Sequence, residues 1–401
     1  AGSADNPLMA DFSRKLEKLD IRKEQKKQLQ SEAEQALLES VGPAYQKLIA
    51  VLNDLQRQSE VEGGAWTLPQ GQAFYRHALH QTTTTKMDAD SIHRLGLSEV
   101  ERIHGEMKVL IKQAGYQGDL PEFFAHIQAE PTLFYPQTEE GKRAYIEEAM
   151  RVISEIKVRL PEVFNVVPIA EIMVKPVEPF REKASVGIAF SHPGAADGSR
   201  PGVFYANTYD MSAMPKYSLP TFAYHEGIPG HHMQVSIAQE LDNVPQFRRA
   251  ASYVSYAEGW GLYAELLPKE MGLYVDFYTD FGRLSAELLR ACRLVVDTGL
   301  HDKRWSREKA INYLMANSSM ERVKATKAVE RYLVLPSQAT AYKIGMLKIL
   351  ELRRKAKHQL GNQFDIREFH DVVLSNGALP LNFLEEMVDR WIVQRLVATE
   401  Q

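Results

Sequence analysis

The sequence predicts a mainly α-helical protein with a small β-sheet beside a histidine-rich helix. Apolar residues recur at helical spacing towards both ends of the chain, whereas three short runs in the middle are rich in Val, Ile, Phe and Tyr. There is no internal repeat. A chain of this length can form one domain or two lobes. We treat residues 1–401 as one helical unit, with the sheet as a subregion at 165–212.

Glycine, proline and capping residues set the expected boundaries. Gly42-Pro43 is expected to interrupt the helical pattern of residues 8–59. Asp119 and Pro121 mark the start of a helix. The Asp119 side chain can cap the free N–H groups, and Pro121 has no N–H that the first turn would leave unpaired. The predicted helices after that pattern are 72–80, 98–115, 120–129, 139–160, 216–241, 246–269, 274–301, 307–316, 320–332, 337–360 and 380–397, and the predicted strands are 170–177, 185–190 and 202–209.

Composition excludes several classes of protein. The 48 basic and 52 acidic residues give a net charge of −4, so we expect no nucleic-acid partner. The sequence contains no run of eighteen apolar residues, so we expect no membrane-spanning helix. Cys292 is the one cysteine, which excludes an internal disulfide and a cysteine-rich metal site. Oligomeric state is left open.

The strongest chemical signal is HEGIPGHHMQ at 225–234. In HExxH zinc sites, two histidines four residues apart share one helix face. His225 and His231 are six apart, which on a regular helix means ~9 Å of rise and a turn of ~240°. Two glycines and a proline lie between them, so the sequence supplies a distortion that both ligands would need. The plainer alternative is a polar helix start with solvated histidines.

Glu258 is the candidate third ligand. It lies in YAEGWGLYAE at 256–265, and a helix, a turn and a second helix would return it to the histidines. The surrounding segment is apolar on all faces, which predicts burial. A buried carboxylate favours a cation, so Glu258 fits a metal better than it fits a solvated helix surface.

Five ordered motifs carry a resemblance that covers most of the chain. Besides the two segments above, they are RLVVDTGLH at 293–301, ERY at 330–332 and PSQATAYKIG at 336–345. Together they resemble the bacterial family catalogued as domain of unknown function 885. That family is similar to the thimet-oligopeptidase-like group of gluzincin zinc metallopeptidases.

The resemblance implies a helical fold with a deep channel and one Zn²⁺ per chain. It places His225 and His231 as ligands, Glu226 as the base that activates water, and Glu258 as the third ligand. The two-residue insertion leaves His232 as the alternate second ligand or a transition-state donor. Many family members are exported or lipoproteins, so we expect a periplasmic or exported protein, with the cytoplasm left open. The chain starts Ala-Gly-Ser without Met, and we hypothesise a missing N-terminal part that carries an export signal.

Other residues are candidates for the reaction and for substrate binding. Tyr342 and His301 join His232 as possible oxyanion donors, although a core tyrosine and a helix C-terminal histidine are the plainer interpretations. Arg331 and Lys343 could hold a substrate carboxylate or pair with nearby acids. The last predicted strand could act as an edge strand that pairs with an extended substrate, which makes Tyr205 and Asn207 candidate contacts.

Three functions compete at this stage. The first is a zinc metallopeptidase that hydrolyses short peptides, and the second is a zinc hydrolase of another small amide or ester. The third is a metal-free helical binding protein. Because Glu226 directly follows a ligand histidine, we expect the metallopeptidase.

Overall fold

The structure is a computed structural model that describes residues 6–58, 63–183, 189–242 and 244–399. It divides into two compact units, residues 1–62 and 63–401. The prediction that 1–401 act as one catalytic unit stays a prediction, since compactness does not say which residues catalysis requires.

The first unit is helical. It contains α1 (Pro7–Glu17), α2 (Lys23–Ala36) and α3 (Gly42–Gln58), with a π-helical turn at Leu37–Val41 joining α2 to α3. The expected interruption at Gly42-Pro43 is wrong. Pro43 lies in the first turn of α3, where the chain tolerates a residue without an N–H, so the backbone stays helical through the dipeptide.

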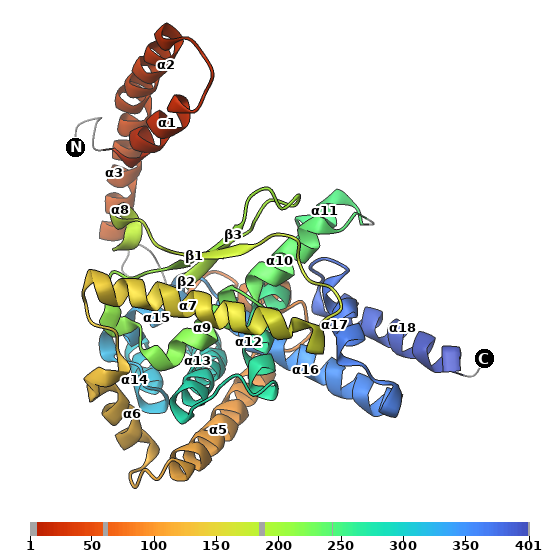
Figure 1. Ribbon diagram of the computed structural model, residues 1–401. Coiled ribbons are helices and arrows are strands. Elements are labelled where there is room, and N and C mark those ends of the chain that lie inside the picture. Colours follow the sequence, from red (N-terminus) through yellow and green to blue (C-terminus); the bar gives the residue numbers. More distant parts are fainter. Residues whose placement is uncertain (1–5, 59–62, 184–188, 243, 400–401) are drawn as a thin grey trace. The chain divides into compact units, whose positions relative to one another are not determined.

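The second unit confirms the mainly α-helical prediction (Figure 1). α6 has the predicted bounds, and most other helices end within a few residues of them. The helix Ile366–Leu374 was not predicted. The helices are α4 (Gly71–Thr83), α5 (Ala89–Gln113), α6 (Leu120–Ala129), α7 (Glu139–Arg159), α8 (Pro179–Glu182), α9 (Leu219–Glu226), α10 (His231–Glu240), α11 (Gln246–Arg249), α12 (Val254–Glu270), α13 (Phe277–His301), α14 (Arg307–Asn317), α15 (Arg322–Val334), α16 (Ala341–Leu360), α17 (Ile366–Leu374) and α18 (Leu381–Thr399).

The predicted sheet is present beside the histidine-rich helices. Its strands are β1 (Ile172–Pro176), β2 (Ala189–His192) and β3 (Gly202–Ala206), in the order β1-β3-β2. β1 runs parallel to β3, and β2 runs antiparallel to it. α7 packs against β1, while α9 and α10 lie against β2. Residues 185–188 of the second predicted strand lie outside the described residues.

Two pairs of helices form the centre of this unit. α5 packs along α13, and α12 packs along α16 (Figure 1). At the second crossing, Gly259 faces Gly345, and a Cβ on Gly345 would lie 1.9 Å from the carbonyl oxygen of Ser255. The two glycines therefore let the backbones touch, and they fix the depth at which the first turns of α12 are buried.

This crossing leads to a stability prediction. Gly345→Ala forces a methyl group into backbone atoms and is expected to lower the free energy of unfolding by about 1–3 kcal/mol. Gly105→Ala is the matched control, because Gly105 lies inside α5 with no atom within 4 Å of the position that its methyl group would occupy. There the change should be neutral or stabilising by up to ~1 kcal/mol. Urea unfolding of both variants measures the difference, and equal effects would contradict the close crossing.

Candidate metal centre

The helix that carries the histidines is broken. α9 ends at Glu226 and α10 begins at His231, so the single helix predicted over 216–241 is wrong, whereas the break expected from the histidine spacing is confirmed. A Cβ on Gly230 would lie 1.9 Å from the carbonyl oxygen of His225. Only glycine therefore fits at this turn. The indole N–H of Trp260 donates to the Pro229 carbonyl at 2.9 Å and ties the break to α12.

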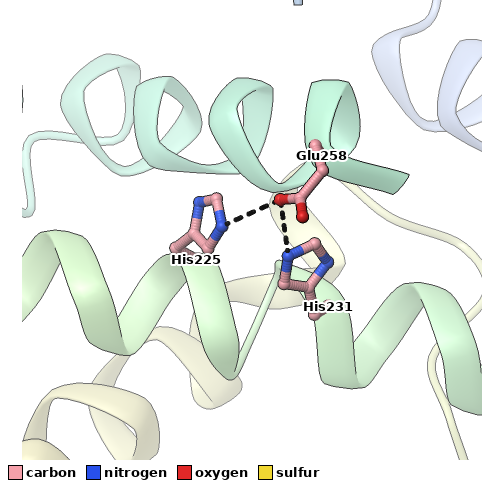
Figure 2. A group of neighbouring side chains, drawn as sticks. All are labelled: His225, His231 and Glu258. Atoms are coloured by element: carbon pink, nitrogen blue, oxygen red, sulfur yellow. Dashed lines mark ion pairs between the residues drawn. The ribbon is translucent and has the colours of Figure 1, made fainter. Parts of the chain in front are cut away.

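The break brings both histidines to one carboxylate (Figure 2). His225 Nε2 lies 3.7 Å and His231 Nε2 3.3 Å from Glu258 Oε2. The two rings stand nearly perpendicular, at 86°, with centroids 4.6 Å apart. One ligand atom from each residue lies within 4.8 Å of the others. Zinc with two imidazoles and one carboxylate at about 2.0–2.2 Å needs donors only slightly closer together, so this donor set fits the ion.

A second carboxylate, Glu265, orients His225. Glu265 Oε1 lies 2.7 Å from His225 Nδ1, and its side chain is 2% exposed. An ionised carboxylate only accepts hydrogen bonds, so Nδ1 carries the hydrogen and Nε2 is left to face Glu258. Arg290 Nη2 lies 3.6 Å from the same oxygen, Glu265 Oε1. The sequence analysis missed Glu265, although its place two helical turns after Glu258 was a readable signal.

The site is electrostatically prepared for a cation. Burial disfavours the charge of Glu258, but His225 and His231 outweigh it and hold the pKa of this carboxyl well below its usual range. Burial would likewise lower the pKa of His225, but Glu258 and Glu265 raise it to about 9. Without metal, a proton on His225 supplies positive charge to these buried carboxylates.

Glu226 lies at the break, next to His225. It is the last residue of α9, directly after a ligand histidine, and its side chain is partly exposed. Within residues 63–183, 189–242 and 244–399, no hydrogen bond or ion pair engages its carboxylate. A carboxylate without a structural partner beside the ligands can accept a proton from water.

The other candidate histidines have structural surroundings. His232 is buried, lies 3.0 Å from the Ala170 carbonyl through Nε2, and packs so tightly on β3 that a Cβ on Gly202 would meet its ring at 2.3 Å. Burial lowers its pKa. His301 uses both nitrogens, accepting from the Ala65 N–H at 2.8 Å and lying 3.0 Å from the Tyr332 carbonyl. Neither belongs to the ligand group, so the structure does not place them with His225.

Tyr342, the remaining candidate oxyanion donor, lies in α16 next to Arg293. Its hydroxyl accepts from Gln338 at 3.3 Å, and its ring lies 4.6 Å from the guanidinium carbon of Arg293, whose charge interacts with Glu258. Arg331 is exposed in the last turn of α15. Lys343 is fully buried and pairs with Glu287, so it is structural.

The candidate strand residues also have structural partners. β3 is the central strand, so the prediction that it forms the edge is wrong, and the edge next to α9 is β2. The ring of Tyr205 stacks on that of Phe190, with the ring centroids 5.2 Å apart. The side-chain amide of Asn207 donates to the Glu182 carbonyl at 2.9 Å, and its oxygen accepts from the N–H of Tyr209. Packing within the sheet therefore accounts for Tyr205, and contacts with α8 and the turn after β3 account for Asn207.

A cavity of about 780 Å³ is lined in part by residues of α9 and α13. Its wall includes Phe222 on α9 and Leu289 on α13, but none of the three ligands. Glu226 follows Phe222 by one helical turn and therefore lies on the same face of α9. The deep channel implied by the resemblance stays a prediction.

Comparison with known proteins identifies the family. The family model of bacterial proteins of unknown function, DUF885, matches residues 2–388. The chain belongs to the DUF885 family. The resemblance expected from the motifs is thereby confirmed, whereas the relation to thimet-oligopeptidase-like enzymes stays a prediction. No curated protein matches the DUF885 chain.

Two solved structures share the fold. One, described as "the putative lipoprotein from Colwellia psychrerythraea", is 38% identical, with a TM-score of 0.93, over 98% of this chain and 68% of that one. A second, a "putative lipoprotein of unknown function from Shewanella oneidensis", is 18% identical, with a TM-score of 0.69, over 94% and 69%. The second likeness shows the fold alone. In the described part of this DUF885 protein, no helix is long and apolar enough to cross a membrane.

The position of Lys343 predicts a loss of stability on substitution. Its Nζ lies 2.6 Å from Glu287 and 3.0 Å from Glu99. Burial opposes the charge of Glu287, but Lys343 and Arg102 lower its pKa from 4.5 to about 2. This stabilisation is present above pH 4.5 and is lost as the pH falls towards 2. Lys343→Met should lower the free energy of unfolding by about 3 kcal/mol at pH 7.

The measurement is urea unfolding at pH 7 and pH 3. The difference from wild type should shrink at pH 3, because Glu287 then gains a proton more readily in the variant. Lys355→Met is the control, since that lysine pairs at the surface and should contribute about 1 kcal/mol or less. If Lys343→Met left stability unchanged at pH 7, the structural role would be refuted.

Proposed function

We propose that this DUF885 protein is a zinc-dependent metallopeptidase that hydrolyses short peptides. The observation that carries the proposal is the convergence of His225, His231 and Glu258 on one point, with the unengaged carboxylate of Glu226 beside them. Two imidazoles and one carboxylate leave a position open for water, as catalytic zinc sites require. One Zn²⁺ per chain is the proposed cofactor, and a short peptide is the proposed substrate.

The chain's residues divide the work of hydrolysis. When bound, zinc polarises the carbonyl and makes water more acidic. Glu226 accepts one proton from the attacking water and delivers it to the leaving nitrogen. The water oxygen forms a bond to the carbonyl carbon, the C–N bond breaks, and an acid and an amine are released. Glu265 keeps His225 in the tautomer that directs Nε2 at the ion. Tyr342 is the proposed donor to the developing oxyanion.

The cellular location is also a proposal. Both solved relatives are described as lipoproteins, provisionally so in their own names. We propose that this protein likewise acts outside the cytoplasm, in an exported form that a lipid anchors.

Metal content and activity should separate ligands from the base. Wild type should hold about one zinc per chain, and His225→Ala, His231→Ala and Glu258→Ala should lose it. Glu226→Gln should keep the zinc and lose roughly 10²–10⁴-fold of its peptide-hydrolysing rate. Elemental analysis gives the metal content, and cleavage of a mixed peptide library followed by mass spectrometry gives the rate.

His232→Ala is the matched control, a histidine next to a ligand but outside the group. It should retain zinc even if packing against the sheet is weakened. Loss of zinc in His232→Ala with retention in His231→Ala would reverse the ligand assignment. A wild-type protein that binds no zinc after incubation with the ion would refute the proposed function.

The second carboxylate has its own expected effect. Glu265→Gln keeps the side-chain shape but donates as well as accepts, so it no longer enforces the tautomer of His225. Zinc affinity should fall by roughly 10–100-fold, while activity returns when zinc is added in excess. Competition with a fluorescent chelator measures the affinity. An unchanged affinity would show that Glu265 does not orient the ligand.

A further inference from the structure

Arg293 is a rigidly held cation in the wall of the site. It lies on α13, and its Nε donates to the Tyr332 hydroxyl at 3.1 Å. Its guanidinium carbon lies 4.6 Å from the ring centroid of Tyr342 and 5.9 Å from that of Tyr332. Three helices, α13, α15 and α16, thus fix its position. Cation–π contacts of this kind hold the guanidinium while leaving its remaining N–H donors available.

Arg293 differs from other buried cations of this unit because it lacks an acidic partner. Arg283 pairs with Asp280, and Lys343 pairs with Glu287. Among residues 63–183, 189–242 and 244–399, no carboxylate forms an ion pair with Arg293, although its side chain is mostly buried. A guanidinium keeps its charge in any surroundings. Burying it without a counter-ion is unfavourable, so the site is suited to an anion that the chain does not provide.

The helices place Arg293 one turn beyond the cavity wall, level with Glu226 and the neighbouring His225. α9 and α13 run side by side in the same direction. Near their starts, a Cβ on Gly282 would lie 2.2 Å from the carbonyl oxygen of Tyr217, just before α9. Further along, Arg290 of α13 lies 3.6 Å from Glu265, the carboxylate that contacts His225 of α9. The cavity wall contains Phe222 and Leu289. One turn further along each helix come Glu226 and Arg293.

The charge of Arg293 is felt at the ligands. Burial lowers the pKa of Arg293, but the two tyrosines and the Glu258 carboxylate raise it by more. A peptide entering from the cavity would therefore meet the proposed base and this cation at the same depth. An anionic group bound at Arg293 would lie beside the bond that Glu226 acts on.

We propose that Arg293 binds the C-terminal carboxylate of a short peptide, so that the enzyme cleaves next to a free C-terminus. This rests on the proposed peptidase function. A carboxylate matches the planar fork of a guanidinium through two parallel hydrogen bonds. The C-terminal carboxylate of a peptide is charged before the reaction begins, so a permanently charged guanidinium that is already in position can bind it. An oxyanion, by contrast, exists only in the transition state.

Binding of peptide acids and amides tests the proposal without relying on catalysis. The parent protein is Glu226→Gln, and the probe is a mixed tripeptide library made with free-acid and with amidated C-termini. Equilibrium dialysis and mass spectrometry measure retention, with zinc and after chelation of zinc. The acids should bind about tenfold or more tighter than the amides in both states. Adding Arg293→Gln should bring this ratio close to one.

Two further variants guard the interpretation. Arg354→Gln removes the same charge from an exposed position on α16 and should leave the ratio unchanged. Arg293→Lys keeps the charge but removes the two parallel N–H donors of the guanidinium, so the ratio of acid to amide binding should be intermediate. If circular dichroism shows that Arg293→Gln does not fold, this ratio in Arg293→Lys tests the proposal in its place.

The outcomes separate this proposal from the peptidase function. A ratio near one in the parent, or one that survives Arg293→Gln, overturns the carboxylate site. Cleavage is measured in protein that retains Glu226. If that protein cleaves peptide acids and amides equally, and Arg293→Gln slows both to the same extent, Arg293 acts on the oxyanion and the carboxylate site is again overturned. Binding that prefers acids through Arg293, without cleavage of any peptide by wild type, refutes the peptidase function and leaves the carboxylate site standing.

Discussion

The whole site depends on a helix that breaks between two ligands. A continuous helix would separate His225 and His231 by more than one zinc ion can span. The turn Gly227–Gly230 removes this separation, and it exists because Gly230 lets its backbone approach the carbonyl of His225 closely. Trp260 then holds the turn against α12. The same helix that holds the break also carries Glu258, so one packing contact sets both the bend and the third ligand.

Close backbone packing extends this constraint to the ligand rings. Gly261 faces His225, and a Cβ there would lie 2.8 Å from the ring. Gly259, on another face of α12, touches α16. Small residues in one helix therefore let a buried carboxylate, an imidazole and a second helix occupy adjacent space. A larger side chain at either glycine would displace the ligands or the helix that supports them.

The sequence predicts those features of the fold and the site that depend on residues close together along the chain. Most of the helices, the sheet beside them, the break and the convergence of Glu258 on the histidines could be predicted, because spacing and breaker residues report on neighbours along the chain. The edge position of β3 could not, since strand order depends on long-range pairing. Nor could the structural role of His301, whose two partners lie on Ala65 and Tyr332, far away in sequence. Glu265 was within reach of a periodicity argument, but its partner was not.

Lys343 and Arg293 show why charge in an apolar helix is ambiguous until the structure is known. Both cations lie in helices rich in apolar residues, and the sequence offered Lys343, with pairing to nearby acids as the alternative, but did not offer Arg293 as a candidate substrate contact. α5 and α13 bring two glutamates to Lys343, which neutralise it inside the core. Arg293 receives two tyrosines instead, and these hold the group without neutralising it. Arg293, the cation without an acidic partner, is therefore the one that we propose as a binding residue. The absence of that partner, rather than the charge itself, separates Arg293 from the structural Lys343.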